Sequence, residues 1–197
     1  DQLGKFKEGF LKHILLVVPI IALLMLQPHF SASMVIITIV AVMMILAGCK
    51  FWHFLVTGGA VGIPGMIGLI ILEPYRLARV TTFLDPWKES RGAGWQVIQS
   101  LYAIGSGGLF GAGLGESKQK YLYIPEPHND FIFSVLAEEL GFVGCVLVIL
   151  LFAIFIWRGV LIAMKAPDMF GSLIAIGITT MVAIQVILNI AVVTSSV

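Results

Sequence analysis

Ionisable side chains gather in one stretch, IPEPHNDFIFSVLAEELG, of a chain that is otherwise strongly apolar. The stretch runs from residue 124 to residue 141 and contains Glu126, His128, Asp130, Glu138 and Glu139. A carboxylate can serve as a general base, and an imidazole beside a carboxylate can ligate a metal ion. His128 and Asp130 lack a third ligand at a recognised metal spacing, so the pattern favours acid–base chemistry over a metal site.

Asp130 is the strongest candidate for a general base. Pro125 and Pro127 make the chain before it stiff and extended, and DFIFSVLAEELG then predicts a helix that ends at Gly141. Asp130 therefore lies near a helix N-terminus, where it could act simply as an N-cap. The same position favours an ionised carboxylate, which is the form that a general base needs at neutral pH.

Two more polar residues follow Asp130 at four-residue steps. Ser134 and Glu138 therefore share its helix face. Glu138 and Glu139 lie next to an apolar segment, where a carboxylate without a partner is costly. For both glutamates we expect a structural ion pair or hydrogen bond rather than catalysis.

The composition predicts an all-α integral membrane protein. The chain has 197 residues, of which 59% are hydrophobic and 12% are charged, and its mean hydropathy is +1.02. A soluble domain of this size cannot bury that much apolar surface. Cys49 and Cys145 lie in or beside apolar segments far apart in the sequence, which favours packed free thiols over a disulfide.

A polytopic helix bundle with one large loop is the expected architecture. Segments of about 20 apolar residues can span a bilayer, and we expect five of them, at 10–27, 32–48, 51–73, 141–163 and 170–193. Residues 74–130 connect the third to the fourth. The whole chain is expected to be a single membrane domain and a fragment of a longer protein.

The distribution of basic residues decides on which side this loop lies. If residues 74–130 do not span, one side of the membrane carries Lys5, Lys7, Lys12, Lys50, Arg158 and Lys165. The short connections on the other side then carry no Lys or Arg, as the positive-inside rule requires. We therefore predict a large extracytoplasmic loop with an amphipathic or re-entrant piece near 95–114.

The loop also carries cations that could bind phosphate, namely Arg76, Arg79, Lys88, Arg91, Lys118 and Lys120. Arginine can hold a phosphate through two parallel hydrogen bonds. For any one of these residues, the alternative is an interaction with ordinary anionic headgroups at the membrane surface.

Several motifs closely resemble the SEDS family (shape, elongation, division and sporulation), which includes FtsW, RodA and SpoVE. They are RVTTFLDPW, LNIAVVTSSV and the run from GAGWQVIQSLYAIGSGGLFGAGLG through IPEPHNDFIFSVLAEELGFVG. The wording KQKYLYIPEPHNDFIF is similar to the FtsW/SpoVE branch. The resemblance implies the fifth to ninth of ten transmembrane helices, so the fragment alone is expected to be inactive.

The resemblance implies a peptidoglycan glycosyltransferase that polymerises lipid II, with inversion at the anomeric carbon. The family's essential loop aspartate matches Asp130, which would accept the proton of the acceptor sugar's 4-hydroxyl. Arg76, Arg79, Lys118, Lys120 and His128 are the expected pyrophosphate-binding residues, and a divalent cation could share that task. Asp85, in FLDPW, ranks below Asp130 and is grouped with Glu126, Ser134 and Glu138 as supporting residues.

The implied setting is the bacterial plasma membrane, with the catalytic loop on the extracytoplasmic face at the division septum. Expected partners are lipid II, a class B penicillin-binding transpeptidase, other divisome membrane proteins and membrane lipids; nucleic acid is not among them. Two other functions stay open at this point. One is a flippase that moves lipid II across the bilayer, and the other is a non-catalytic scaffold for the transpeptidase.

The charge asymmetry gives a first test. Single cysteines at Asn129 and Lys165, in full-length protein lacking Cys49 and Cys145, should react with an impermeant thiol reagent from opposite faces of the membrane. Asn129 should be labelled from the outside and Lys165 from the inside. Labelling of both positions from one face would contradict the topology.

Overall fold

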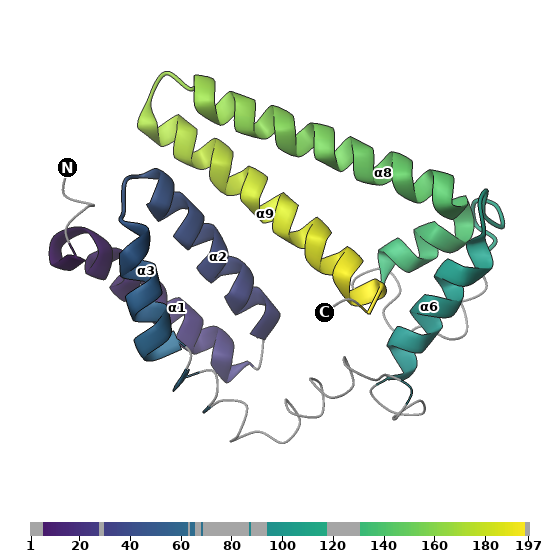
Figure 1. The fold of residues 1–197 in the computed structure, drawn as a ribbon, viewed down its shortest axis with the longest axis horizontal. Helices are drawn as coiled ribbons and strands as arrows, with labels where there is room; N and C mark the ends of the chain where they lie inside the picture. The colour runs from purple at the N-terminus through teal and green to yellow at the C-terminus, as the bar shows by residue number, and fades with distance from the viewer. Residues whose placement is uncertain are drawn as a thin grey trace. The chain divides into compact units, whose positions relative to one another are not determined.

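A computed structural model describes residues 6–27, 30–62, 64–65, 68, 87, 94–117 and 131–195. Within these residues the structure is helical and contains no strand, which confirms the all-α prediction (Figure 1). The helices are α1 (Leu11–Leu26), α2 (Phe30–Leu46), α3 (Phe51–Thr57), α6 (Trp95–Gly107), α8 (Ile132–Lys165) and α9 (Met169–Val193). Two π-helical turns, η1 (Phe6–Phe10) and η2 (Gly58–Gly62), precede α1 and follow α3.

Two of the described helices are long and apolar enough to cross a bilayer. They are α8, with 34 residues, and α9, with 25 residues, and only 11% and 17% of their most apolar windows are buried. Helices that are apolar and yet exposed suit a lipid environment better than water. The shorter α1 and α2 are also apolar, while the five spanning segments as a set stay a prediction.

The predicted helix end at Gly141 is confirmed in an unexpected form. The helix that begins at Ile132 ends at Gly141, a non-helical residue with φ 66° and ψ −167°, and a second helical stretch follows it directly within α8. The predicted amphipathic piece near 95–114 contains α6, whose buried side includes Val97, Ile98 and Ala103. Its place on the membrane stays a prediction.

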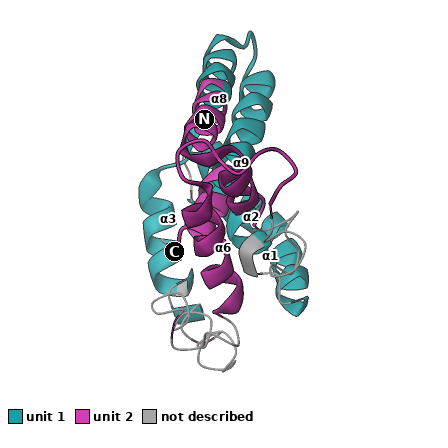
Figure 2. Cartoon of the chain, turned by 90° about the vertical axis from the view of Figure 1, so that its right-hand side faces the viewer, with its two compact units in different colours: residues 1–67, 155–185 teal, residues 68–154, 186–197 magenta. Residues whose placement is uncertain are grey.

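The chain forms two compact units (Figure 2). Unit 1 comprises residues 1–67 and 155–185, and unit 2 comprises residues 68–154 and 186–197. Because α8 and α9 are long, each contributes one part to unit 1 and another part to unit 2. The remaining helices belong to one unit each.

Unit 1 has a small aromatic core at the junction of η1, α2 and α3. Phe10, Met44 and Cys49 are buried there. The rings of Phe10 and Phe54 lie edge to face, with their centroids 4.9 Å apart. Burial raises the pKa of the Cys49 thiol. Cys49 and Cys145 are both buried free cysteines, which confirms that they pack as thiols.

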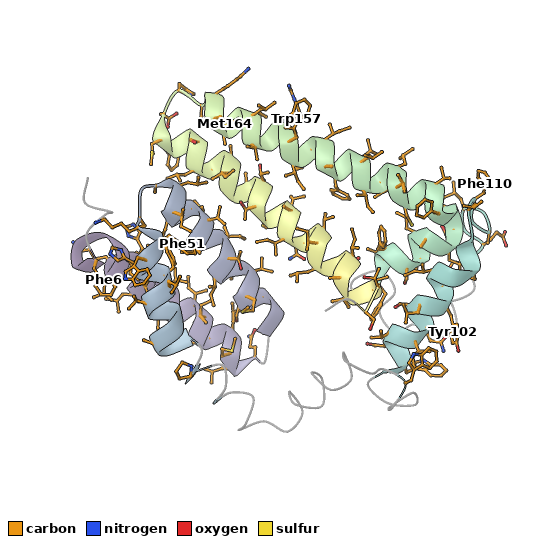
Figure 3. All side chains as sticks on the ribbon, in the orientation of Figure 1. Phe6, Phe51, Tyr102, Phe110, Trp157 and Met164 are labelled. Carbon is orange, nitrogen blue, oxygen red and sulfur yellow. The ribbon has the colours of Figure 1, made fainter. Side chains whose placement is uncertain are left out.

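The unit 1 parts of α8 and α9 pack closely where Gly159 faces Thr179. A Cβ atom on Gly159 would overlap the hydroxyl oxygen of Thr179 and lie 2.9 Å from its methyl carbon. Thr179 is buried, and its hydroxyl donates to the carbonyl of Ala175 at 2.7 Å. Small residues of this kind let membrane helices approach each other. Elsewhere α8 presents apolar side chains outward, including Trp157 and Met164 (Figure 3).

The close contact predicts a pair of compensating substitutions. Gly159→Ala should destabilise the detergent-solubilised full-length protein by about 1–3 kcal/mol, because the added methyl overpacks Thr179. A second change, Thr179→Ala, should restore part of the loss. The control is Gly58→Ala in the same unit, where a Cβ atom meets nothing within 4 Å. Equal thermal midpoints for Gly159→Ala and Gly58→Ala would contradict this packing.

Candidate functional site

The first turns of α8 carry the two predicted site residues that the structure describes, Ser134 and Glu138. The other eight lie outside the described residues, so their roles stay predictions: Asp130, Arg76, Arg79, Lys118, Lys120, His128, Glu126 and Asp85. The structure does describe the residues on either side of segment 118–130, which contains Asp130. These are Ser117 before it and Phe131 directly after it.

Phe131 is anchored in the core of unit 2. Its side chain is buried with Val193, against Ile104, Phe133 and Val192, and so joins the start of α8 to α6 and the end of α9. Its carbonyl accepts hydrogen bonds from the backbone N–H of Ser134, at 3.1 Å, and from the Ser134 hydroxyl, at 2.7 Å. The buried hydroxyl of Ser134 thus stabilises the first turn of α8 and fixes the residue that follows Asp130.

Glu138 binds Ser117, the residue that precedes the segment with Asp130. Its side chain is only 4% exposed, and its Oε2 accepts a hydrogen bond from the Ser117 hydroxyl at 2.6 Å. Ser117 is buried as well. Hydroxyl bonds to ionised carboxylates are short and stronger than neutral ones. The hydrogen-bonding partner that the sequence led us to expect for Glu138 is therefore Ser117, 21 residues away in the chain.

The backbone around Gly141 exchanges hydrogen bonds with the loop that follows α6. In an unbroken helix, the carbonyls of Glu138 and Glu139 would accept from the amides of Phe142 and Val143. Here those carbonyls accept instead from Ala112, at 2.9 Å, and Gly113, at 3.1 Å.

The two amides released by the break find partners in the same loop. Phe142 donates to the carbonyl of Gly108 at 2.9 Å, and Val143 donates to that of Leu109 at 3.2 Å. The loop thus satisfies these four backbone groups at the break. In hydrocarbon an unsatisfied backbone group costs several kcal/mol, so the loop is what makes a break tolerable at this point of an apolar helix.

Glycine is required on both sides of this exchange. Gly141 adopts a backbone conformation that is essentially restricted to glycine, and a Cβ atom there would overlap the amide nitrogen of Gly111. Gly111 also has a positive φ, of 79°, and a Cβ atom there would overlap the carbonyl of Glu139. A side chain at either position would push the loop away from the helix.

The C-terminal end of α6 lies equally close to α8. A Cβ atom on Gly107 would overlap the carbonyl oxygen of Ala137. At the other end of α6, the buried hydroxyl of Ser100 donates to the carbonyl of Val193 at 2.9 Å. Helix α6 therefore packs closely against α8 and is hydrogen-bonded to α9. The loop that follows α6 consequently begins beside the break in α8.

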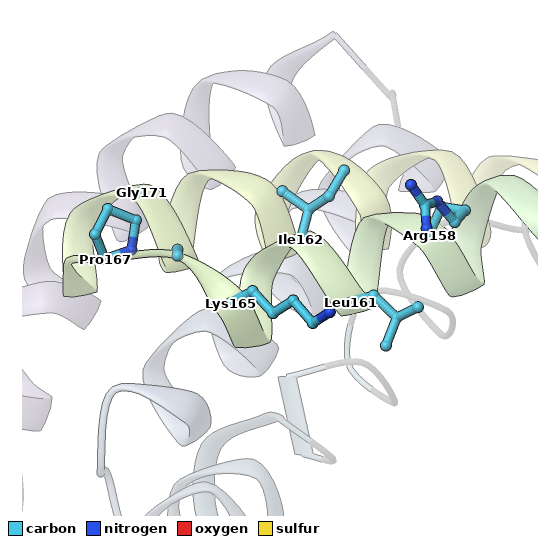
Figure 4. A pocket seen from close by; sticks show the side chains of 7 residues that line it. Arg158, Leu161, Ile162, Lys165, Pro167 and Gly171 are labelled. Atoms are coloured by element: carbon cyan, nitrogen blue, oxygen red, sulfur yellow. The ribbon is translucent and has the colours of Figure 1, made fainter.

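A separate open groove lies in unit 1 at the turn from α8 to α9 (Figure 4). Its volume is about 440 Å³, and it is lined by Arg158, Leu161, Ile162, Lys165, Ala166, Pro167 and Gly171. The groove offers two cations and no carboxylate, so it could pair with an anion but has no general base. Among the described residues, no group of three or more His, Cys, Asp or Glu is arranged to hold a metal ion.

Comparison with known proteins identifies the family. The family model described as "Cell cycle protein", FtsW/RodA/SpoVE, matches residues 2–197. The chain belongs to the FtsW/RodA/SpoVE family. This confirms the resemblance found in the sequence motifs.

Relatives of this FtsW/RodA/SpoVE chain include two named bacterial proteins. It is 47% identical over 193 residues to "Stage V sporulation protein E" of Bacillus subtilis, covering 98% of this chain and 52% of the relative. It is 42% identical over 194 residues to "Probable peptidoglycan glycosyltransferase FtsW" of Trichlorobacter lovleyi, covering 98% and 51%. The chain thus spans about half the length of the curated relatives it matches.

A solved structure shares the fold of this FtsW/RodA/SpoVE chain. It is described as "Structural coordination of polymerization and crosslinking by a peptidoglycan synthase complex". The TM-score is 0.74 at 27% sequence identity, and the match covers 98% of this chain and 53% of the other. Together with the exposed apolar helices, this match confirms the all-α membrane architecture.

The residues that build the exchange in this FtsW/RodA/SpoVE chain were not predicted from its sequence. The sequence predicted only an amphipathic or re-entrant piece near 95–114, which ends before Ser117. The available signal was the glycine in the middle of the apolar run at Gly141, combined with a second glycine-rich stretch upstream. Neither indicates by itself that the two pair.

The exchange predicts a difference between two glycine substitutions. Gly115→Ala places a side chain at φ 86° with nothing within 4 Å, which costs about 1–2 kcal/mol of backbone strain. Gly141→Ala adds an overlap with Gly111, worth about another 1–3 kcal/mol. Thermal unfolding of the purified full-length protein should therefore show the larger loss for Gly141→Ala. Equal losses would mean that the loop does not pack against the break.

Proposed function

We propose that the full-length protein polymerises lipid II into glycan strands, as a peptidoglycan glycosyltransferase. The observation that carries the proposal is the 42% identity, over 98% of this chain, to a relative named a probable peptidoglycan glycosyltransferase. Other FtsW relatives of the same name show 41–46% identity over most of the chain. A role in division or in sporulation is consistent with the relatives' names.

The proposed reaction is a single inverting displacement. The 4-hydroxyl oxygen of the acceptor sugar attacks the anomeric carbon of the donor, a new C–O bond forms, and the bond to undecaprenyl pyrophosphate breaks. Asp130 takes the hydroxyl proton as general base. Arg76, Arg79, Lys118, Lys120 and His128 offset the charge that develops on the leaving pyrophosphate, and a divalent cation could supply further positive charge there.

The described contacts support this assignment by fixing both ends of the segment that contains Asp130. Ser117, just before it, is hydrogen-bonded to Glu138, and Phe131, just after it, is buried against Val193. Both anchors are on the first turns of α8 or packed against them. Catalysis by a general base depends on holding the base in place relative to the substrate. Glu138 and Ser134 act in this proposal as positioning residues, and Glu126 and Asp85 as supporting ones.

The proposed setting follows from the charge pattern and from the structural relative. Asp130 faces the extracytoplasmic side of the plasma membrane, where the sugar of a lipid-linked substrate is presented, and the division septum is the proposed site of action. The solved relative is described in terms of a peptidoglycan synthase complex that coordinates polymerization and crosslinking. That description supports a class B penicillin-binding transpeptidase as partner, together with other divisome membrane proteins.

The general-base role is tested by Asp130→Asn in the full-length protein with its partner transpeptidase present. Asparagine is similar in size but cannot accept the proton, so glycan synthesis from lipid II should fall by roughly 10²–10⁴-fold. Binding of lipid II and of the partner should survive, because the side-chain volume is kept.

Two outcomes would contradict the proposal. Near-normal polymerisation by the folded variant would remove Asp130 from the reaction. Loss of lipid II translocation across vesicles, with polymerisation intact, would instead support a flippase. The thermal midpoint of the variant provides the folding control.

A further inference from the structure

The loop that packs against the break in α8 has an apolar tip that no described part of the protein covers. Its tip residues are Leu109, 64% exposed, Phe110, 81% exposed, and Leu114, 78% exposed. Phe110 projects from the loop at the outer edge of unit 2 (Figure 3). Three large, exposed apolar side chains on one short loop are unfavourable in water and indicate a contact surface.

The tip is continuous with the exposed apolar face of α8. The hydrogen bonds from Phe142 to Gly108 and from Val143 to Leu109 place the loop directly beside the helix where it resumes. Phe142 and Val143 are themselves 63% and 50% exposed. From there the exposed apolar surface runs along α8 through Leu147 and Leu150. Helix α8 is long and apolar enough to cross a bilayer, so this exposed apolar face is suited to contact with lipid.

Helix α6 carries the residues expected at the edge of that medium. Its exposed side includes Trp95 and Tyr102, seven residues apart and therefore on one face. The rings of Tyr102 and Trp87 lie edge to face, with their centroids 6.1 Å apart. Tryptophan and tyrosine are enriched where the acyl chains meet the headgroups. The opposite side of α6 is buried, so the helix has an inner face and an interfacial face.

The polar residue Glu116 limits how deeply the loop can insert into the bilayer. Glu116 is exposed only two residues after Leu114, and an exposed carboxylate requires water or headgroups nearby. Insertion is therefore shallow, on the order of 5–10 Å below the headgroups, as for other amphipathic segments that lie in the interface.

We propose that Leu109, Phe110 and Leu114 insert among lipid acyl chains at the outer boundary of the bilayer and anchor the loop there. The loop and its hydrogen-bonded helix break then form a membrane-embedded wedge, and Ser117 and Glu138 lie beside it at the level of the headgroups. The occupant of this surface is lipid, not another protein segment. The proposal does not depend on the glycosyltransferase activity proposed above.

The test uses full-length protein lacking Cys49 and Cys145, reconstituted in vesicles of phosphatidylcholine and phosphatidylglycerol. A fluorescent probe is attached to single cysteines replacing Phe110 or Leu114, whose exposed side chains can be exchanged with little effect on folding. Quenching is measured with lipids that carry a nitroxide near the top of the acyl chain, and separately with aqueous iodide. Glu116→Cys is the matched control on the same loop, and Leu150→Cys is the control for a lipid-facing helix position.

We expect strong nitroxide quenching and weak iodide quenching at positions 110 and 114, as at position 150, and the reverse order at position 116. The ratio of the two quenching constants should differ several-fold between Phe110→Cys and Glu116→Cys. Iodide quenching at positions 110 and 114 equal to that at 116 would place the tip in water and overturn the proposal. Quenching by neither agent would mean that another protein segment covers the tip, which would overturn it as well.

Discussion

The carbonyls of Glu138 and Glu139 bond to a loop instead of to their own helix, and the rest of unit 2 depends on this exchange. It replaces two helical hydrogen bonds by four between the helix and the loop, through Gly108, Leu109, Ala112 and Gly113. Each such bond contributes only about 1 kcal/mol in water, but leaving its groups unpaired in an apolar setting costs more. The exchange therefore removes the penalty of a broken helix and fixes a loop at the same time.

The positions of Ser117 and Phe131, which flank the segment that contains Asp130, follow from that arrangement. Because the loop is held at the break, Ser117 lies where its hydroxyl reaches the buried carboxylate of Glu138. The loop follows α6 in the chain, and α6 packs against the start of α8, where its Ile104 contacts the buried Phe131. The segment with Asp130 is thereby flanked by two residues that contact the same helix. Membrane insertion of the loop tip, as proposed above, would fix the depth of this assembly in the bilayer.

Much of the fold could be predicted from the sequence, but the hydrogen bonds between α8 and the loop that follows α6 could not. The helix end at Gly141, the helix near residue 95 and the buried thiols follow from local signals, namely a glycine after an acidic helix, an amphipathic pattern and cysteines in apolar runs. The pairing of Ala112 with Glu138 uses backbone groups that every residue carries, so no side-chain pattern marks it. The contact of Ser117 could not be predicted for a different reason, because only the folded loop brings its hydroxyl to Glu138, 21 residues away in the chain.

Hydrogen exchange at the amides of Ala112 and Gly113 tests this backbone pairing most directly, in the wild-type full-length protein in lipid vesicles. These two amides belong to a loop, and the hydrogen bonds that they donate to the carbonyls of Glu138 and Glu139 protect them from exchange. We predict protection comparable to that of the amides within α6. Fast exchange at both, with Phe142 and Val143 protected, would mean that α8 runs unbroken through Gly141, and would contradict the account.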